Sequence, residues 1–594
     1  MFSAKKPSRL GQWNGRRRSS RSEEPVLPKL WRRAVLLRMA VVLVTVLGAT
    51  GLGFAFGPTH SFRTGEVIGY ELRARAEFDV VNQAQTDRKR DEAVERLPVD
   101  LRDERACQAM RNAEPAVFDH YPAGTLLVPR GQPITEAQTL LLRAENQAYW
   151  QSRGYAEHIR RGVALFLVLN LLSALVVLYV VRFQAGLAQS LPKITGVCAL
   201  VLLTLALGLL LSRPPWHAVL IPLTVTALIL TITYNPQFAL LMSLSLSLAM
   251  IVSLGGRLND FLIATGGQAT AILVLRSVRT RTRLVQVGLM AGIACAAMTV
   301  ATGLTSNQKP DLIAFDSLRG LAWGSLAGFL VSGLLPIVER LFAVVTDVSL
   351  LELADGSHPL LQELVRRAPG TYTHSMTVAT LAEPAAEAIN ANPLLTRVGS
   401  YFHDVGKMLK PHYFIENQTG ENRHDDLEPA LSTLIIIGHV KDGIALAQQY
   451  GLPRPILDFI AQHHGTTLVE YFYRQALKSQ EETGLAPTLP DGSPNPLESS
   501  FRYPGPKPRT REAGIVMLAD AVESSSRALS QPTPGSLRKL IHEMMMKRLL
   551  DGQFEESGLT LTELKLIEES LCKGLIALYH SRIKYPEETE RKAG

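Results

Sequence analysis

The sequence has little cysteine and no internal repeat. Its four cysteines are scattered without a CxxC motif or a paired spacing, at Cys107, Cys198, Cys295 and Cys572. This pattern indicates neither a disulfide framework nor a thiolate metal site. Any bound metal must therefore be held by nitrogen and oxygen atoms.

Beyond its first 33 residues, the chain also lacks an excess of positive charge. The first 33 residues carry ten Lys and Arg against two Glu, which accounts for the whole formal net charge of +8. Such a basic segment is typical of a membrane flank, because Lys and Arg concentrate on the cytoplasmic side of membrane helices. The charge gives no reason to expect a nucleic-acid polymer as a partner.

Apolar residues are concentrated between Val163 and Ile337, whereas both flanks are charged and globular in composition. A chain of 594 residues is also too long for one ordinary core, so two or three domains are expected. Together these features predict a polytopic membrane protein with soluble ends.

A separate apolar run, residues 34–56, follows the basic segment 1–33 and predicts a cytoplasmic tail and a retained first membrane helix. A cleaved signal peptide is the alternative, but its basic region is normally short. Residues 57–160 are polar, with a charged, helix-like stretch followed by a turn-rich one. They predict a small α+β domain outside the cytoplasm.

Seven further membrane helices are expected within residues 161–340. Their apolar segments lie near residues 162–182, 192–212, 216–234, 236–254, 259–275, 284–304 and 319–338. The segment at 259–275 is short for a span of about 20 residues and contains Gly266 and Gly267. Parity supports it, because one crossing plus seven returns the chain to the cytoplasm at Glu339 and keeps the arginines around Arg279 inside.

Residues 341–594 predict an all-α domain in which histidines and aspartates stand in short motifs. TYTHSM, YFHDVGK, IIGHV, AQHHGT and MLADAVES contain His374, His403, Asp404, His439, His463, His464 and Asp520. Taken alone, each is more often a surface or capping residue. Together, five imidazoles and two carboxylates are too many donors for one four-coordinate ion and predict two metals. Asp404, with two oxygens, is the expected bridge between them.

These motifs, together with KPHYFIENQTGEN and FRYPGPKPRTREAG, resemble the HD-domain phosphohydrolases. Within that superfamily the chain is similar to the membrane receptors with seven transmembrane segments and an intracellular HD domain. The resemblance covers roughly residues 350–580 in sequence and the membrane region in layout. It implies a mainly α protein of the bacterial inner membrane, in which a polytopic helical domain is followed by a cytoplasmic all-α HD domain.

The resemblance further implies a phosphodiesterase that hydrolyses cyclic di-AMP to pApA with two divalent transition-metal ions, Mn or Fe. One ion is then expected at His374, His403, Asp404 and Asp520, and the other at Asp404, His439, His463 and His464. Lys407 is expected to reach a phosphate oxygen, with a solvated surface lysine as the alternative. The other expected partners are membrane lipid, an unidentified ligand of the outer domain and a second copy of the chain.

Three alternatives remain open. Related HD proteins use the same metal chemistry on cyclic di-GMP, but they bear a Gly-Tyr-Pro signature near the site, where this chain has Arg502, Tyr503 and Pro504 far along the sequence. A nucleoside triphosphate or alarmone hydrolase is a weaker alternative. A receptor that binds a nucleotide without cleaving it is disfavoured, because such a receptor would not need seven metal donors.

Overall fold

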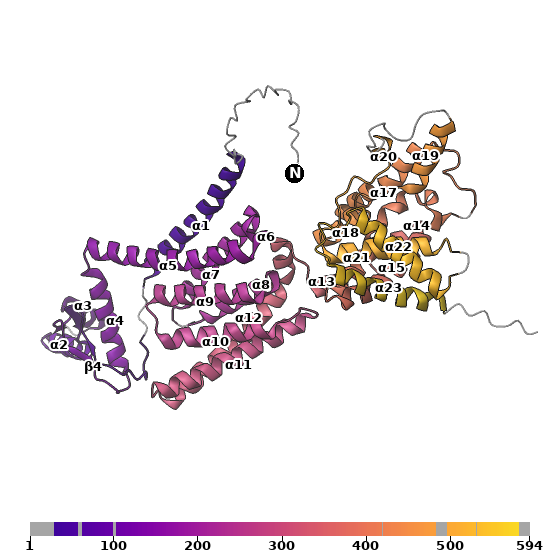
Figure 1. Ribbon diagram of the computed structural model, residues 1–594. Helices are drawn as coiled ribbons and strands as arrows, with labels where there is room; N and C mark the ends of the chain where they lie inside the picture. Colours follow the sequence, from indigo (N-terminus) through magenta and orange to yellow (C-terminus); the bar gives the residue numbers. More distant parts are fainter. Residues whose placement is uncertain are drawn as a thin grey trace, which may run out of the picture.

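The computed structural model describes residues 29–57, 62–98, 103–214, 216–418, 420–482, 496–529 and 532–580. Figure 1 shows three parts in a row, with a small mixed domain on one side of a bundle of long helices and a larger helical domain on the other side. Within the described ranges the strands lie only in the small domain near the N-terminus. The prediction of a mainly α protein is confirmed.

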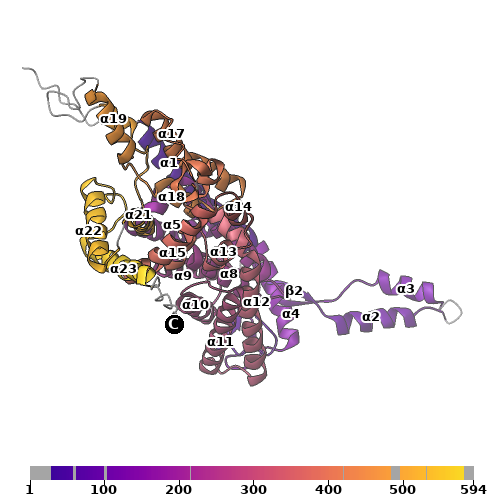
Figure 2. The same ribbon diagram turned by 90° about the vertical axis from the view of Figure 1, so that its right-hand side faces the viewer.

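The small domain combines short strands with helices, as the sequence predicts. Its elements are β1 (Leu72–Arg73), β2 (Phe78–Val81), α2 (Gln83–Glu95), α3 (Glu104–Ala113), β3 (Phe118–Tyr121), β4 (Leu126–Val128) and α4 (Glu136–Gln151). Strand β1 pairs with β4 and β2 pairs with β3, both antiparallel. Helices α2 and α3 project from the rest of the protein, as Figure 2 shows. Val128, Ile134 and Leu142 are buried and join α4 to the strands.

All eight predicted membrane segments coincide with helices. The bundle consists of α1 (Lys29–Phe56), α5 (Tyr155–Phe183), α6 (Ala185–Ala188), α7 (Leu191–Leu211), α8 (Leu220–Thr233), α9 (Pro236–Leu254), α10 (Leu258–Val274), α11 (Arg281–Thr305) and α12 (Pro310–Phe342). Among the described residues seven helices are long and apolar enough to cross a membrane, and six of them belong to this bundle. The exceptions among the predicted spans are α8, with 14 residues, and α10, with 17.

The seventh long apolar helix is α17 (Pro429–Gln449), and it does not belong to the bundle. It packs within the C-terminal helical domain, where His439 from α17 is 2% exposed. Its buried residues are Ser432, Thr433, His439, Gly443 and Ala447, whereas Leu431 and Leu434 are exposed. Length and composition alone therefore count one helix too many as a membrane span.

Helices α11 and α12 pack along a seam of glycines, from Gly288 and Gly292 on one helix to Gly324 and Gly328 on the other. A Cβ atom built on Gly324 would lie 2.4 Å from the Cα atom of Gly292, and one built on Gly288 would lie 2.6 Å from that of Gly328. The backbones can approach this closely only because the side chains are absent. Close backbone contact stabilises helix pairs in lipid, where there is no hydrophobic driving force between helices.

The small domain is joined to one end of this bundle by specific polar contacts. Arg63 pairs with Asp316 of α12 at 2.9 Å, and Arg257 pairs with Glu66. The Gln308 side chain accepts a hydrogen bond from the Val67 N–H at 3.0 Å and donates one to the Val67 carbonyl at 2.7 Å. These contacts fix the small domain to the α10 and α12 ends of the bundle.

The opposite end of the bundle contacts α13 (Asp347–Leu353), the first helix of the C-terminal domain. Arg279 lies 3.7 Å from Asp347, and Arg281 lies 3.2 Å from Glu352. The predicted inside arginines and the start of the C-terminal domain therefore lie at the same end of the bundle. This placement agrees with the parity argument from the sequence.

The C-terminal domain is helical throughout its described residues. After α13 it contains α14 (Pro359–Arg367), α15 (Pro369–Ala388), α16 (Pro393–Phe402), η2 (Val405–Leu409), η3 (Pro411–Tyr413), η4 (Ile415–Asn417), α17, α18 (Arg454–Gln462), α19 (Glu470–Glu482), α20 (Pro496–Ser500), α21 (Arg511–Ser526), α22 (Pro534–Leu550) and α23 (Leu561–His580). Proline at the start of several helices suits their first turn, because the missing N–H has no helical partner there.

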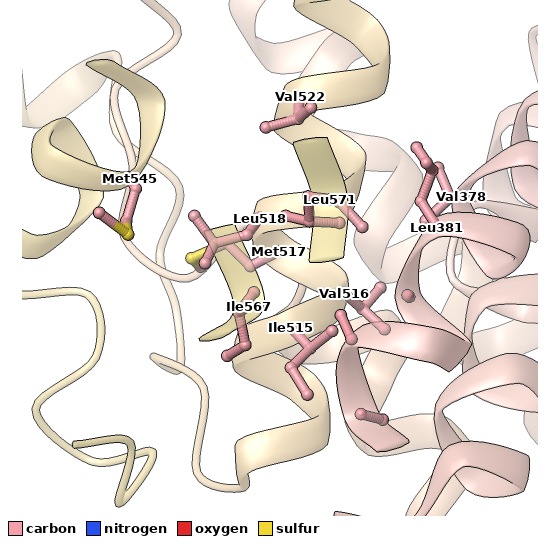
Figure 3. Close-up of a cluster of buried hydrophobic side chains, with 14 of the residues drawn as sticks. Val378, Leu381, Ile515, Val516, Met517, Leu518, Val522, Met545, Ile567 and Leu571 are labelled. Carbon is pink, nitrogen blue, oxygen red and sulfur yellow. The ribbon is translucent and has the colours of Figure 1, made fainter. Parts of the chain in front are cut away.

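Helix α21 runs through the centre of this domain. Its residues Ile515, Val516 and Leu518 are at most 1% exposed, and Figure 3 shows them among side chains of α15 and α23, including Val378 and Leu571. A helix that is buried on most sides holds its polar residues in fixed positions. This core therefore determines where Asp520, further along α21, is placed.

Candidate metal centre

The seven predicted donors come from several helices of the C-terminal domain and meet in one cluster. They are His374 in α15, His403 and Asp404 between α16 and η2, His439 in α17, His463 and His464 after α18, and Asp520 in α21. All are buried except His464, whose side chain is 20% exposed. The cluster is therefore shielded from water on most sides and opens at one histidine.

The carboxylate of Asp404 divides the cluster into two halves. Its Oδ2 lies 3.4 Å from Nε2 of His374 and 3.3 Å from Nε2 of His403. Its Oδ1 lies 3.4 Å from Nε2 of His439 and 3.5 Å from Nε2 of His463. The structure thereby brings together two groups of four donors that share Asp404, with the donor atoms of each group within 4.8 Å of one another. Their members are those of the two ligand sets implied by the sequence.

Asp520 contacts both halves of the cluster, whereas the sequence placed it in only one. Its Oδ1 lies 3.1 Å from Nε2 of His374, and its Oδ2 lies 3.7 Å from Nδ1 of His464. The two oxygens of this carboxylate thus point to donors of different sets. The sequence could not give this orientation, because it depends on the rotation of α21 in the core.

Backbone carbonyls fix the ring orientation of two histidines. Nδ1 of His403 lies 2.7 Å from the Ser400 carbonyl, and Nδ1 of His439 lies 2.5 Å from the Ile436 carbonyl. An imidazole that donates its Nδ1–H to a carbonyl keeps the lone pair on Nε2. In both residues Nε2 faces Asp404, so the lone pairs are directed at the centre of the cluster.

Glu523 is a member of the site that the sequence analysis missed. Its Oε2 lies 2.6 Å from Nδ1 of His374, and its Oε1 accepts a hydrogen bond from Arg527 at 2.5 Å. A carboxylate on the far nitrogen of a metal-binding histidine fixes the ring and makes it more basic. The available signal was the spacing, because Glu523 follows Asp520 by three residues and lies on the same face of a helix.

At three of the donors the electrostatic environment favours the protonation states that a metal requires. His374 differs, because burial alone would lower its pKa but hydrogen bonds to the carboxylates of Asp404, Asp520 and Glu523 raise it well above the usual value. Burial lowers the pKa of His439 to about 3 and holds the pKa of His464 well below its usual value. Burial alone would raise the pKa of Asp404, but Lys407 and His403 lower it well below the usual range. The two imidazoles are therefore neutral and the carboxylate is ionised near pH 7, as metal ligands must be.

Several polar atoms at the centre lack hydrogen bonds. Oδ1 of Asp404 and Nε2 of His403 are buried and make no hydrogen bond among the described residues, whereas Oδ2 of Asp404 is paired with the Lys407 ammonium. Buried polar atoms are rarely left in this state, because the loss of hydration is not compensated. A group of convergent oxygen and nitrogen donors of this kind fits metal cations, so the cluster can bind metal.

Lys407 is largely covered beside the cluster and is not a solvated surface residue. Its Nζ lies 2.7 Å from Oδ2 of Asp404 and 3.1 Å from Oε1 of Glu416, and its side chain is 13% exposed. Thr371 donates a hydrogen bond to the same Glu416 oxygen at 3.0 Å. Glu416 thus holds the lysine at the centre, and it is a second residue that the sequence analysis missed.

The second HD dipeptide, at His424 and Asp425, lies outside the cluster. The Nε2–H of His424 donates to the Tyr413 carbonyl at 2.8 Å, and its ring packs against Phe472 with centroids 4.9 Å apart. These contacts give His424 a structural role. Its sequence context also differs, because it lacks the apolar helical surroundings of the first dipeptide.

Tyr503, in contrast, lies at the cluster although it is far along the chain. Its ring is 4.3 Å from that of His464 between centroids, and its N–H donates to the Thr467 carbonyl at 3.0 Å. The string of Arg502, Tyr503 and Pro504 is therefore near the site, contrary to what its position in the sequence suggested. Arginine, not glycine, still precedes the tyrosine.

Comparison with known protein families agrees with this division of the chain. Residues 159–346 match the model of the 7TM receptor with intracellular HD hydrolase, and residues 371–525 match that of the HD domain. The two matches thus cover most of the membrane bundle and much of the domain that holds the cluster. The chain is therefore similar to the 7TM receptors with an intracellular HD hydrolase in both its membrane part and its C-terminal part.

Curated relatives carry the name cyclic-di-AMP phosphodiesterase PgpH. The protein from Listeria monocytogenes is 37% identical over 63% of this chain and 51% of its own length, and that from Bacillus subtilis is 34% identical over 72% and 60%. This chain therefore spans about half to three fifths of these relatives. The solved HD domain of L. monocytogenes phosphodiesterase PgpH in complex with cyclic-di-AMP aligns with 38% of this chain and 100% of its own, at 44% identity and a TM-score of 0.35.

Proposed function

We propose that this protein is a membrane-bound, metal-dependent phosphodiesterase that hydrolyses cyclic di-AMP to the linear dinucleotide pApA. The observation that carries the proposal is the division of the Asp404 oxygens between two groups of histidines. A carboxylate shared in this way suits a two-metal hydrolytic site. The substrate is proposed from the name of the relatives in L. monocytogenes and B. subtilis.

Two divalent transition-metal ions, Mn or Fe, are the proposed cofactors. His374, His403, Asp404 and Asp520 would hold one ion, and Asp404, His439, His463 and His464 the other. Bound there, the ions would lower the pKa of water and neutralise the charge that develops on the phosphodiester. Lys407 would place a further positive charge beside the substrate, and Glu416 would keep its ammonium group in position.

Product analysis tests this proposal. The purified chain, loaded with Mn or Fe, is incubated in parallel with cyclic di-AMP and cyclic di-GMP, and the products are separated by chromatography. We expect pApA from the first substrate and little product from the second. Equal or faster cleavage of cyclic di-GMP would support the alternative substrate, whereas tight binding of either nucleotide without any product would support a non-catalytic receptor.

We further propose that the protein lies in the bacterial cytoplasmic membrane with its C-terminal domain in the cytoplasm. The arginines near Arg279 support this, because they contact α13 and such residues favour the inside. A reporter that is active only in the cytoplasm is expected to be active when fused after Arg283 or Glu339 and silent when fused near Gly131. Activity of the fusion near Gly131 would contradict the proposed outer domain.

Regulation by the outer domain is proposed from the continuity of α12. This helix has 33 residues and connects Asp316, which pairs with Arg63 of the small domain, to Glu339. Glu339 in turn accepts hydrogen bonds from the Thr346 N–H at 2.8 Å and the Ser349 hydroxyl at 2.6 Å, at the start of α13. A shift of one helix can thus reach the domain that holds the metal centre.

Deletion of residues 60–155, with both flanking helices preserved, tests this regulation. We expect a membrane-inserted variant whose basal hydrolysis differs from that of the full chain, because one end of α12 has lost its partners. Insertion is checked by fractionation, and activity is compared at equal protein in the membrane. The hydrolysis rates of the variant and the full chain are compared with and without an extract of the medium that faces the outer domain. If the two proteins behave alike under both conditions, the domain serves only for assembly.

A further inference from the structure

A polar cavity lies between the small domain and the membrane bundle. Arg63 and Glu66 line it on the side of the small domain, and the ends of α10, α11 and α12 line it on the other side. Its volume is about 110 Å³. This is several times the space that one water molecule needs, so the cavity has room for a small organic molecule. These helix ends are opposite those that contact α13, so the cavity is separate from the metal centre.

Charged side chains around the cavity form a series of ion pairs in which the signs alternate. Asp316 binds Arg319 at 2.8 Å and Arg63 at 2.9 Å. The N–H of Arg63 donates to Glu66 at 3.0 Å, and the same carboxylate pairs with the guanidinium of Arg257. The side chains of Asp316 and Glu66 are only 16% and 10% exposed. These two carboxylates are therefore engaged, and their ion pairs fix the walls of the cavity.

Two polar groups of opposite charge at the start of α10 are not used in this series. Nη1 of Arg257 binds Glu66, but Nη2 is buried without a hydrogen-bond partner. The carboxylate of Asp260 accepts the backbone N–H of Arg257 at 3.0 Å and makes no ion pair among the described residues. Arg63 attracts Asp260 electrostatically, but the Arg63 guanidinium is hydrogen-bonded to Asp316. An unpaired N–H donor and an unpaired carboxylate thus line the same cavity.

The guanidinium of Arg257 is held in a fixed orientation. Glu66 binds one of its nitrogens, and its Cζ lies 5.2 Å from the centre of the Phe62 ring. A planar guanidinium that is held along one edge directs its remaining N–H groups in a fixed direction. A buried donor without a partner is costly, so Nη2 calls for an oxygen acceptor on a ligand.

The remaining wall of the cavity is partly apolar. Ile263, Leu312 and Ile313 are half-buried and line it. Small-molecule sites combine apolar contact of this kind with a few polar groups that fix the orientation of the ligand. A carboxylate suits Arg257, an ammonium group suits Asp260, and an aliphatic group suits the apolar wall. A free aliphatic α-amino acid carries all three, and as a zwitterion it adds no net charge to the site.

We propose that this cavity binds a small aliphatic amino acid, whose carboxylate lies at Arg257 and whose ammonium group lies at Asp260. Bound there, the ligand connects the small domain to the start of α10, beside the end of α12 that holds Asp316. The inference gives a chemical class to the ligand of the outer domain. It rests on the proposed regulation for any effect on hydrolysis, whereas binding itself needs neither substrate nor metal.

Calorimetric titration of the purified full chain in lipid nanodiscs tests the binding. L-alanine, L-valine and L-leucine are titrated in turn, and we expect saturable binding of at least one of them. The N-acetyl derivative of the best ligand lacks the ammonium group, and its amide lacks the carboxylate. Each derivative is expected to bind at least about tenfold more weakly, because it loses a charge-assisted hydrogen bond. Absence of binding by all three amino acids, or equal binding of either derivative, would overturn the inference.

Two conservative variants locate the site. Arg257→Lys keeps a positive charge beside Glu66 but removes the second guanidinium nitrogen, and Asp260→Asn keeps an oxygen acceptor but removes the charge. Both are expected to weaken binding about tenfold or more. Asp87→Asn is the matched control for Asp260→Asn, because Asp87 is exposed on α2 and does not line the cavity, and it should bind as the wild type does. Wild-type affinity in folded Arg257→Lys and Asp260→Asn variants would place the ligand elsewhere and contradict the inference.

Hydrolysis is measured separately, so that failure of the proposed function can be recognised. With the amino acid bound, the rate of cyclic di-AMP hydrolysis is expected to change in the wild type and not in Asp260→Asn. Binding without any change in rate would contradict the regulatory role and support the binding site alone. A chain that binds the amino acid but cleaves no cyclic dinucleotide would contradict the proposed enzyme and still support the site.

Discussion

Asp404→Asn is expected to lower hydrolysis of the cyclic dinucleotide on the order of 10³-fold or more, because the change removes a group on which the whole catalytic unit depends. The carboxylate faces His374 and His403 with one oxygen and His439 and His463 with the other. An amide cannot offer anionic oxygens to two cations. Turnover and bound metal are measured on the same preparation, and both should fall.

Asp425→Asn is the matched control for this experiment. Asp425 belongs to the second HD dipeptide, is exposed and accepts a hydrogen bond from the Asn422 side chain at 3.0 Å. The same chemical change there should leave turnover and metal content unaltered. Near wild-type turnover and metal content in a folded Asp404→Asn variant would refute the bridging role.

Gly324→Leu is expected to prevent correct packing of the membrane bundle. Even a Cβ atom at this position would lie 2.4 Å from the Cα atom of Gly292 and 2.5 Å from its nitrogen. Because backbone atoms cannot yield as a side chain can, the helices must separate, at a cost of about 3 kcal/mol or more. The yield of monodisperse protein extracted from membranes and its thermal stability are the measurements, and both should fall sharply.

Gly333→Leu provides the comparison on the same helix. Gly333 is exposed, and a Cβ atom there would meet nothing within 4 Å. A leucine at this position adds the same apolar side chain without a collision, so the protein should be as stable as the wild type. Equal stability of the two variants would show that the glycine seam is not required for packing.

The grouping of the seven donors could be expected from the sequence because each donor stands in a short motif on a helix or at its end. What could not be predicted is the orientation of the donors in space. Asp520 contacts both halves of the cluster, since the core around α21 fixes the rotation of that helix. Glu416 was missed for a related reason, because its relation to the centre depends on contacts with Lys407 and Thr371 and on no local pattern.

The membrane helices illustrate a different limit. Gly266 and Gly267 weakened the prediction of α10, because glycine lowers both hydropathy and helix propensity. In the structure these residues allow close approach to α11, where a Cβ atom at Gly266 would lie 2.8 Å from the Met298 side chain. Hydropathy measures the affinity of a segment for lipid and contains no information on how its neighbours pack. For α17 hydropathy made the opposite error, because it marked a helix of the C-terminal domain as a candidate membrane span.

The boundaries of the five proposed segments of the chain remain predictions, although the helices follow them closely. Pairing in the small domain shows why its architecture could be expected only in outline. Leu72 of β1 lies opposite Val128 of β4, so the strands are brought together by residues far apart in the sequence. Such short strands carry too little local pattern to reveal their partners.

The glycine seam has a mechanical consequence for the whole molecule. Contacts between α11 and α12 extend from Gly303 beside Ile313 at one end to Leu284 beside Gly328 at the other. Two helices interlocked over this length resist bending, so the hairpin moves as one stiff body that tilts or slides. A displacement imposed at Asp316 by the small domain would then arrive at α13 with little attenuation, whereas a loosely packed pair would dissipate it as local flexing.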